Sequence, residues 1–161
     1  MNRSYFKQMK SGTGYNISTA IDKQQMELTG VTRVNGNLPD SEAKVGPFQI
    51  IATKPNNFVV VRVNLDRATL AEAGDFKKYL FTILNEGINN LIIDLNNCEF
   101  IDSTFFGVIV GALKKAKTTN GNVFLVYDPE KQIPLFTETG LAKIFTTFTN
   151  LEEAYSKLNL D

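Results

Sequence analysis

The stretch IIDLNNCEFIDSTFFGVIVGALKKAKTTNGNVFLVY, residues 92–127, decides the fold of this chain. It begins within a short apolar strand, predicted over 91–95, and passes through a polar loop into an apolar helix that is predicted to follow Ser103 and to run to about Lys117. Ser103 occupies the position of a helix N-cap, and three lysines in the last turns suit the negative end of the helix dipole. An Asn-Gly turn then leads into a second apolar strand over 122–127. The stretch therefore predicts a strand–helix–strand unit.

The flanking sequence continues this alternation of strands and helices. Two β-branched runs, 48–52 and 58–63, are separated by a turn and predict a hairpin. Apolar residues at helical spacing predict a helix over 70–86 that ends at Gly87. Strands that alternate with helices favour an α/β fold. The remaining predicted elements are a helix over 128–136 that starts late or is kinked at Pro134, a strand over 143–148 and a closing helix over 151–158.

Composition excludes several kinds of site. The chain has 161 residues, 17 Lys plus Arg against 17 Asp plus Glu, no histidine and one cysteine. Without histidine there is no Ser-His-Asp or Cys-His nucleophile, no His-bound zinc and no phosphohistidine relay. The zero net charge disfavours a nucleic-acid partner. We therefore expect a protein that is not an enzyme, with no cofactor and no metal site.

The first 45 residues differ in character from the rest. They are rich in Ser, Thr, Gly, Asn and Gln, and their apolar residues keep no period. We predict a flexible or weakly structured N-terminal extension over 1–45 and a folded domain over 46–161. The start has no apolar segment of a secretory signal, and no apolar run could span a bilayer. We expect a cytoplasmic protein without membrane insertion.

The quoted stretch resembles the centre of the STAS domain, the fold of bacterial anti-sigma-factor antagonists. Members carry a strand, a loop that ends in Asp-Ser-Ser or Asp-Ser-Thr, and then a helix. VVVRVNLDRATLAEA at 59–73 is similar to the family's second strand and following helix, and PEKQIPLFTETGLAKIF at 129–145 to a later helix and its Thr-Gly-Leu turn. The resemblance covers roughly 47–158. It implies a STAS fold, a small mixed β-sheet covered by about four helices.

The resemblance also implies a partner switch in bacterial transcription regulation. The unphosphorylated antagonist binds an anti-sigma factor that is also a serine kinase of the histidine-kinase-like ATPase type. Phosphorylation of the serine after the Asp breaks the complex, and a PP2C-type phosphatase restores it. On this chain the serine is Ser103, and its switch-site neighbours are Asp66, Asp102 and Thr104. A phosphate at a helix start would face unpaired amides and add about −1.5 to −2 charge beside Asp102. In the alternative interpretation, Ser103 only caps the helix.

One residue departs from the family pattern. The family usually has Gly after the Ser-Ser or Ser-Thr pair, whereas this chain has Phe105. Phe105, Val108 and Ala112 fall beside the predicted core stripe of Phe106, Ile109, Val110 and Leu113, so the first two helical turns are apolar nearly all round. We predict that these three residues form a partner interface. The alternatives are that Phe105 blocks the kinase or that the helix has a wider buried face.

Other functions and other candidate residues remain open at this point. The domain could be a constitutive STAS scaffold or an accessory subunit of a signalling or transport complex, without phospho-switching. It could also be a small-molecule or nucleotide sensor. Asp66 and Asp94 are too few for a metal site, and we expect both to be solvated loop charges. Cys98 is expected to be a small buried residue rather than a reactive thiol.

Overall fold

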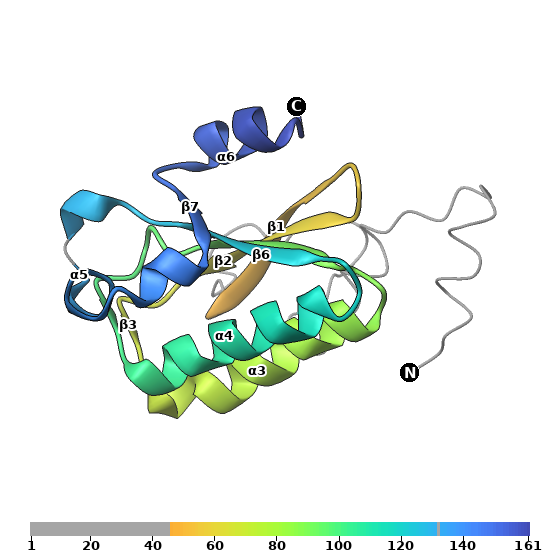
Figure 1. Ribbon diagram of the computed structural model, residues 1–161. Coiled ribbons are helices and arrows are strands. Elements are labelled where there is room, and N and C mark those ends of the chain that lie inside the picture. The colour runs from red at the N-terminus through yellow and green to blue at the C-terminus, as the bar shows by residue number, and fades with distance from the viewer. Residues whose placement is uncertain (1–45, 132) are drawn as a thin grey trace, which may run out of the picture.

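A computed structural model describes residues 46–131 and 133–161, and its centre is a five-stranded mixed β-sheet (Figure 1). The strand order is β1-β2-β4-β6-β7; β1 is antiparallel to β2, and the other pairs are parallel. A second, two-stranded sheet pairs β3 with β5. The strand bounds are β1 (Phe48–Lys54), β2 (Phe58–Val63), β3 (Arg67–Ala68), β4 (Asn90–Asp94), β5 (Phe100–Ile101), β6 (Asn122–Val126) and β7 (Thr146–Phe148).

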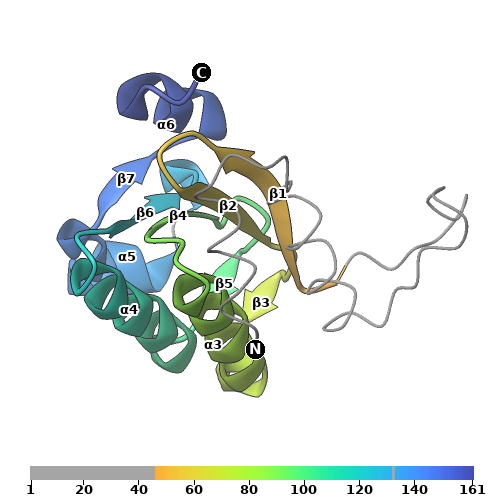
Figure 2. The same cartoon turned by 90° about the vertical axis from the view of Figure 1, so that its right-hand side faces the viewer.

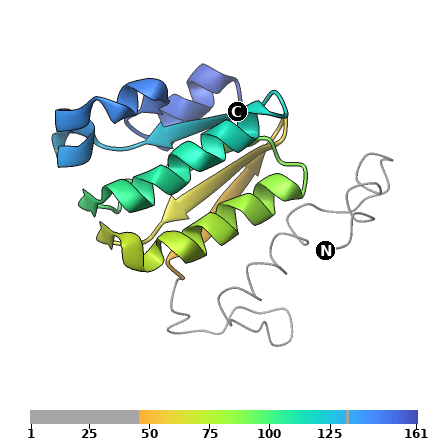
Figure 3. The same cartoon turned by 60° about the horizontal axis from the view of Figure 1, so that its bottom comes forward.

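Helices cover both faces of the sheet. The longest two, α3 (Leu70–Asn85) and α4 (Ser103–Lys117), run side by side over one face (Figures 1 and 3). The closing helix, α6 (Leu151–Leu158), lies on the opposite side of the sheet (Figure 2). The remaining helical segments are η1 (Pro129–Lys131), α5 (Pro134–Thr139) and η2 (Leu141–Ile144). The predicted small mixed sheet with about four helices is confirmed.

Two separate cores follow from these layers. The larger core lies between the sheet and the α3–α4 layer and contains the aromatic cluster of Phe48, Phe76 and Phe105. The smaller core lies under α6, where Val60, Ile92 and other sheet residues meet the apolar side of that helix. Residues on successive strand positions thus enter different cores, as the alternation of side chains in a strand requires.

The outer strands β1 and β7 form the two edges of the sheet. β1 contains an irregularity in its register between Ile50 and Ala52, which has the form of a β-bulge. Beside it, the amide of Ile50 donates a hydrogen bond of 3.1 Å to the hydroxyl of Tyr79 on α3. Burial raises the pKa of Tyr79 to about 12, so the hydroxyl stays protonated at neutral pH. β7 has only three residues.

Several predicted boundaries need correction. The helix predicted over 128–136 starts late, as expected from Pro134, which takes the first helical position of α5; the residues before it form the separate 3-10 helix η1. The strand predicted over 143–148 begins only at Thr146, because η2 occupies the residues before it. The two-residue strands β3 and β5 were not predicted, since two residues carry no detectable period. The predicted extension over 1–45 lies outside the described residues.

Candidate functional site

Two loops meet at the carboxyl end of the parallel strands, next to the start of α4. The carbonyl oxygen of Asp66 accepts hydrogen bonds from the amides of Glu99 (2.8 Å) and Phe100 (3.1 Å). One step further, the amide of Asp102 donates to the carbonyl of Ala68 at 3.0 Å. This small parallel ladder brings the Asp66 loop beside the Asp102 loop, although the two are more than thirty residues apart in the chain.

Asp102 is the residue that fixes this corner. It is the N-cap of α4, and its carboxylate accepts a hydrogen bond from the amide of Phe105 at 2.8 Å. Its second oxygen accepts from the amide of Leu70, the first residue of α3, also at 2.8 Å. One carboxylate therefore serves the free amides of two helices and is stabilised by the positive ends of both. The predicted N-cap role of Ser103 is wrong, because the cap lies one residue earlier.

Ser103 and Thr104 occupy the first two positions of α4, and both side chains are exposed. Within residues 46–131 and 133–161, no group forms a hydrogen bond with the hydroxyl of Ser103. The cap is supplied by Asp102, so this hydroxyl has no structural task that a modification would remove. The site thus consists of an accessible hydroxyl on a rigid corner, adjacent to a fixed carboxylate.

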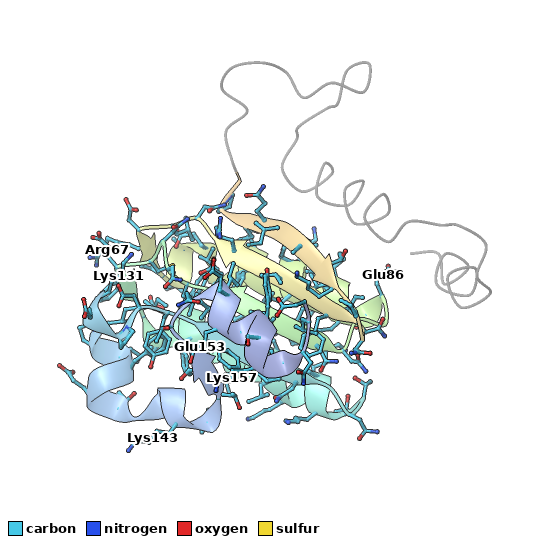
Figure 4. All side chains as sticks on the ribbon, turned by 90° about the horizontal axis from the view of Figure 1, so that it is seen from above. Arg67, Glu86, Lys131, Lys143, Glu153 and Lys157 are labelled. Atoms are coloured by element: carbon cyan, nitrogen blue, oxygen red, sulfur yellow. The ribbon has the colours of Figure 1, made fainter. Side chains whose placement is uncertain are left out.

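The surroundings of the corner carry charges of both signs. Asp66 is exposed. Its neighbour Arg67 lies over the ring of Phe100, with 4.1 Å between the guanidinium carbon and the ring centroid. Lys131 lies at the same end of the molecule as Arg67 (Figure 4), and its ammonium group donates to the carbonyl of Asn96. Both basic groups have identified contacts, whereas the Ser103 hydroxyl has none in the described chain.

The predicted partner interface of Phe105, Val108 and Ala112 is wrong for two of its three residues. Phe105 and Ala112 have no exposed surface. Phe105 stacks on Phe76 of α3, with ring centroids 4.5 Å apart and planes at 6°. Val108 is partly exposed and packs against the same core. Phe105 is thus a core residue, so it neither meets a partner nor projects from the helix start to block a kinase.

Two other residues considered in the sequence, Asp94 and Cys98, lie in the interior of the domain. Asp94 is not a solvated loop charge: it is almost fully buried at the end of β4, 2.9 Å from the Nε atom of Arg62. Cys98 is buried, as expected, and burial raises the pKa of its thiol to about 12. The described part of the chain contains no group of three or more His, Cys, Asp or Glu residues that could hold a metal ion. None of its helices is long and apolar enough to cross a membrane.

One element of the corner was missed from the sequence although a signal was present. Thr69 and Glu72 form a capping box at the start of α3: Thr69 accepts from the amide of Ala71, and the Glu72 carboxylate accepts from the amide of Thr69. Thr followed three residues later by Glu is the usual signature of this motif. The link from Asp102 to Leu70 has no such signal, because it joins residues 32 positions apart.

Replacing Asp102 by alanine removes both acceptors at once. We expect the free energy of unfolding to fall by about 2 kcal/mol, of which about 1 is the lost cap of α4 and about 1 the lost bond to Leu70. Urea unfolding measures this loss. Asp102→Asn keeps one acceptor oxygen and should lose about half as much. Thr69→Ala, which removes only a cap of α3, is the matched control at about 1 kcal/mol. Equal stability of Asp102→Ala and wild type would contradict the bridging role.

The chain is similar in sequence and in fold to several known proteins. The family profile described as STAS domain matches residues 49–154. A proposed anti-sigma factor antagonist of Thermotoga maritima is 31% identical over 113 residues, which are 70% of this chain and 96% of that protein. The crystal structure of a proposed anti-sigma factor antagonist from the same organism, TM1081, has a TM-score of 0.57 and 28% identity, and covers 70% of this chain and 93% of its own. The Bacillus cell fate determinant SpoIIAA, solved in its phosphorylated form, shares the fold, with a TM-score of 0.52 and 20% identity over 69% of this chain and 98% of its own.

Proposed function

Because this chain belongs to the STAS domain family, we propose that it is an anti-sigma factor antagonist controlled by phosphorylation of Ser103. In this proposal the unphosphorylated protein binds an anti-sigma factor that is also a serine kinase of the histidine-kinase-like ATPase type. The complex releases the sigma factor. Phosphorylation of Ser103 breaks the complex, and a PP2C-type phosphatase restores the hydroxyl. The protein acts in the cytoplasm, by binding, and it is a substrate of the two enzymes rather than an enzyme itself.

The observation that carries the proposal is the exposed hydroxyl of Ser103 at a corner whose structure does not depend on it. Asp102 already caps α4 and also holds the start of α3. A kinase can therefore approach Ser103 without first unfolding a turn. The hydroxyl oxygen would attack the γ-phosphorus of the kinase-bound ATP, ADP would leave, and the proton would pass to a base of the kinase, since this chain has no histidine.

The electrostatics of the corner explain how one phosphate would release a partner. The phosphate adds about −1.5 to −2 charge directly after Asp102 and in the neighbourhood of the Asp66 loop. A partner that fits the corner around a small neutral hydroxyl would meet a bulky anion and a stronger negative field. Like charges brought together at an interface cost several kcal/mol. Asp102 remains held by two amides, so the change at the surface needs no refolding of the domain.

Binding of Ser103 variants tests this proposal. The probes are the purified serine-kinase-type anti-sigma factors encoded in the same genome, measured by calorimetry with ADP present. We expect Ser103→Ala to bind like the unphosphorylated protein and to stay bound with ATP. We expect Ser103→Asp to bind about 100-fold more weakly, which corresponds to about 2.7 kcal/mol.

Thr104→Ala is the matched control, because Thr104 is also exposed on the first turn of α4. It should accept one phosphate per chain, at Ser103, as phosphosite mapping by mass spectrometry would report. Phosphate on Thr104 rather than on Ser103 of the wild-type protein, or equal affinity of the Ser103→Ala and Ser103→Asp proteins, would refute the switch and favour a constitutive complex.

A further inference from the structure

The outer surface between α3 and α4 has a composition that the fold does not require. The two helices lie side by side with their first residues at the same end (Figure 3), where Asp102 links them. Lys115 of α4 reaches the Phe81 ring of α3 at 5.5 Å near the other end. Residues at helical spacing along the facing outer flanks form what we name the α3–α4 seam: Leu70, Gly74, Lys77 and Phe81 on α3, and Thr104, Gly107, Val108, Gly111 and Lys115 on α4.

Two glycines in the seam have no role in packing. A side chain added at Gly74 or at Gly107 would meet no atom within 4 Å, and both residues are exposed. Neither has the positive φ that would demand glycine. Apart from proline, glycine is the least favourable residue in the middle of a helix. The folded domain would therefore be more stable with alanine at both positions, so the small size of these residues points to something outside the fold.

The seam contains two lysines, Lys77 and Lys115, and no acidic residue, although α3 carries Glu72 and Asp75 outside the seam. Five lysines lie on the two helices, and none forms an ion pair within the described chain. Lys77 and Lys115 flank the half-buried ring of Phe81, at 5.6 and 5.5 Å from its centroid. The lysines at the end of α4 also suit its helix dipole, but those of α3 lie in the middle of that helix and have no such role. The five are Lys77, Lys78, Lys114, Lys115 and Lys117.

The seam also begins at the candidate switch site. Its first residue on α3, Leu70, is one of two large apolar side chains strongly exposed in the described residues, at 68% of its surface. Its amide is held by Asp102, the residue before Ser103. A ligand that covers Ser103 and extends over Leu70 therefore continues naturally along the seam. An exposed leucine next to small residues and followed by lysines suits a segment with an apolar side and acidic groups.

We propose that the anti-sigma partner lays an acidic segment lengthwise along the α3–α4 seam. Its apolar side approaches the helix backbones at Gly74 and Gly107, and its carboxylates meet Lys77 and Lys115. This inference rests on the proposed function and extends it from the Ser103 corner to a defined surface. It also assigns the partner's chemistry. The partner's segment approaches the helix backbones closely near Ser103, and it carries negative charge about two to three helical turns further along the seam.

The first test separates stability from binding. Gly74→Ala and Gly107→Ala should each raise the melting temperature by about 3 °C. Gly74→Leu should weaken binding of the anti-sigma factor at least 30-fold without lowering the melting temperature. Ser156→Leu, which places the same side chain at an exposed position of α6 on the far side of the sheet, is the control and should bind normally. Normal binding by Gly74→Leu would overturn the seam proposal.

The second test uses charge and does not depend on packing. The double variant Lys77→Glu with Lys115→Glu should slow association at least tenfold and reduce its dependence on salt. Lys157→Glu on α6, where Figure 4 shows the side chain, is the control and should associate normally. If the panel of anti-sigma factors binds the wild type but does not distinguish the seam variants, only the seam is wrong. If no member of the panel binds the wild type, the proposed function falls as well.

Discussion

Replacing Phe105 by glycine, the residue usual at this position in the family, should lower the free energy of unfolding by about 5 kcal/mol. Removing a fully buried phenylalanine side chain costs about 3–5 kcal/mol, and glycine in a helix adds about 1. Phe105 has no exposed surface and stacks on Phe76 of α3. Its removal would therefore leave a cavity inside the core. Urea unfolding followed by circular dichroism measures the loss.

Such a loss approaches the whole stability of an ordinary domain, so a milder variant is needed beside it. Phe105→Leu fills most of the space and should cost about 1.5 kcal/mol while leaving the protein folded. Phe81→Ala is a matched control on the neighbouring helix, because Phe81 is only partly buried and should cost about 1 kcal/mol. A loss at Phe105 no greater than that at Phe81 would contradict its place in the core. The Phe105→Leu protein should also be phosphorylated at the wild-type rate, since its side chain does not reach the surface.

Replacing Arg62 by methionine should lower the free energy of unfolding by about 3 kcal/mol. The variant keeps the apolar stem but leaves the carboxylate of Asp94, whose side chain is 2% exposed, without its cation at 2.9 Å. A charge left unpaired in the interior costs about 3–5 kcal/mol, and the partial exposure of Arg62 places this case at the lower end. The amide of Asn96 would remain the donor to the same carboxylate.

A second substitution distinguishes the lost pair from lost packing. Adding Asp94→Asn to Arg62→Met removes the orphaned charge and keeps an oxygen for the amide of Asn96, so at least half of the loss should be recovered. The pair joins β2 to β4 on the side of the sheet that faces α6. If the double variant were no more stable than Arg62→Met, the unpaired charge of Asp94 would not be the source of the loss.

The order of the main elements could be predicted because their periods are long and their ends are marked. The hairpin of β1 and β2, the helices α3 and α4, the strand β6 and the closing helix α6 all appear within one or two residues of the predicted ranges. The short strands β3 and β5 could not be predicted, since their pairing depends on two loops meeting in space.

The orientation of α4 shows most clearly what the sequence leaves open. The helical period fixes that one side is apolar, but nearly every side of the first two turns is apolar here. The predicted stripe included Val110 and Leu113, whereas the fully buried residues include Phe105 and Ala112. The buried stripe of α4 is rotated from the predicted one towards Phe105 and Ala112, because α3 packs along the side of α4 that carries these residues. The helical period of α4 contains no information on the position of α3. The predicted interface failed for the same reason.

The edges of the sheet determine how the protein behaves at high concentration. A long, regular outer strand is a template for strands of other molecules and leads to aggregation. In the described chain, β1 is interrupted by its bulge and gives the amide of Ile50 to Tyr79, and β7 offers only three residues. Neither edge can seed an extended intermolecular ladder. The two edges therefore disfavour edge-to-edge pairing between copies of the folded domain.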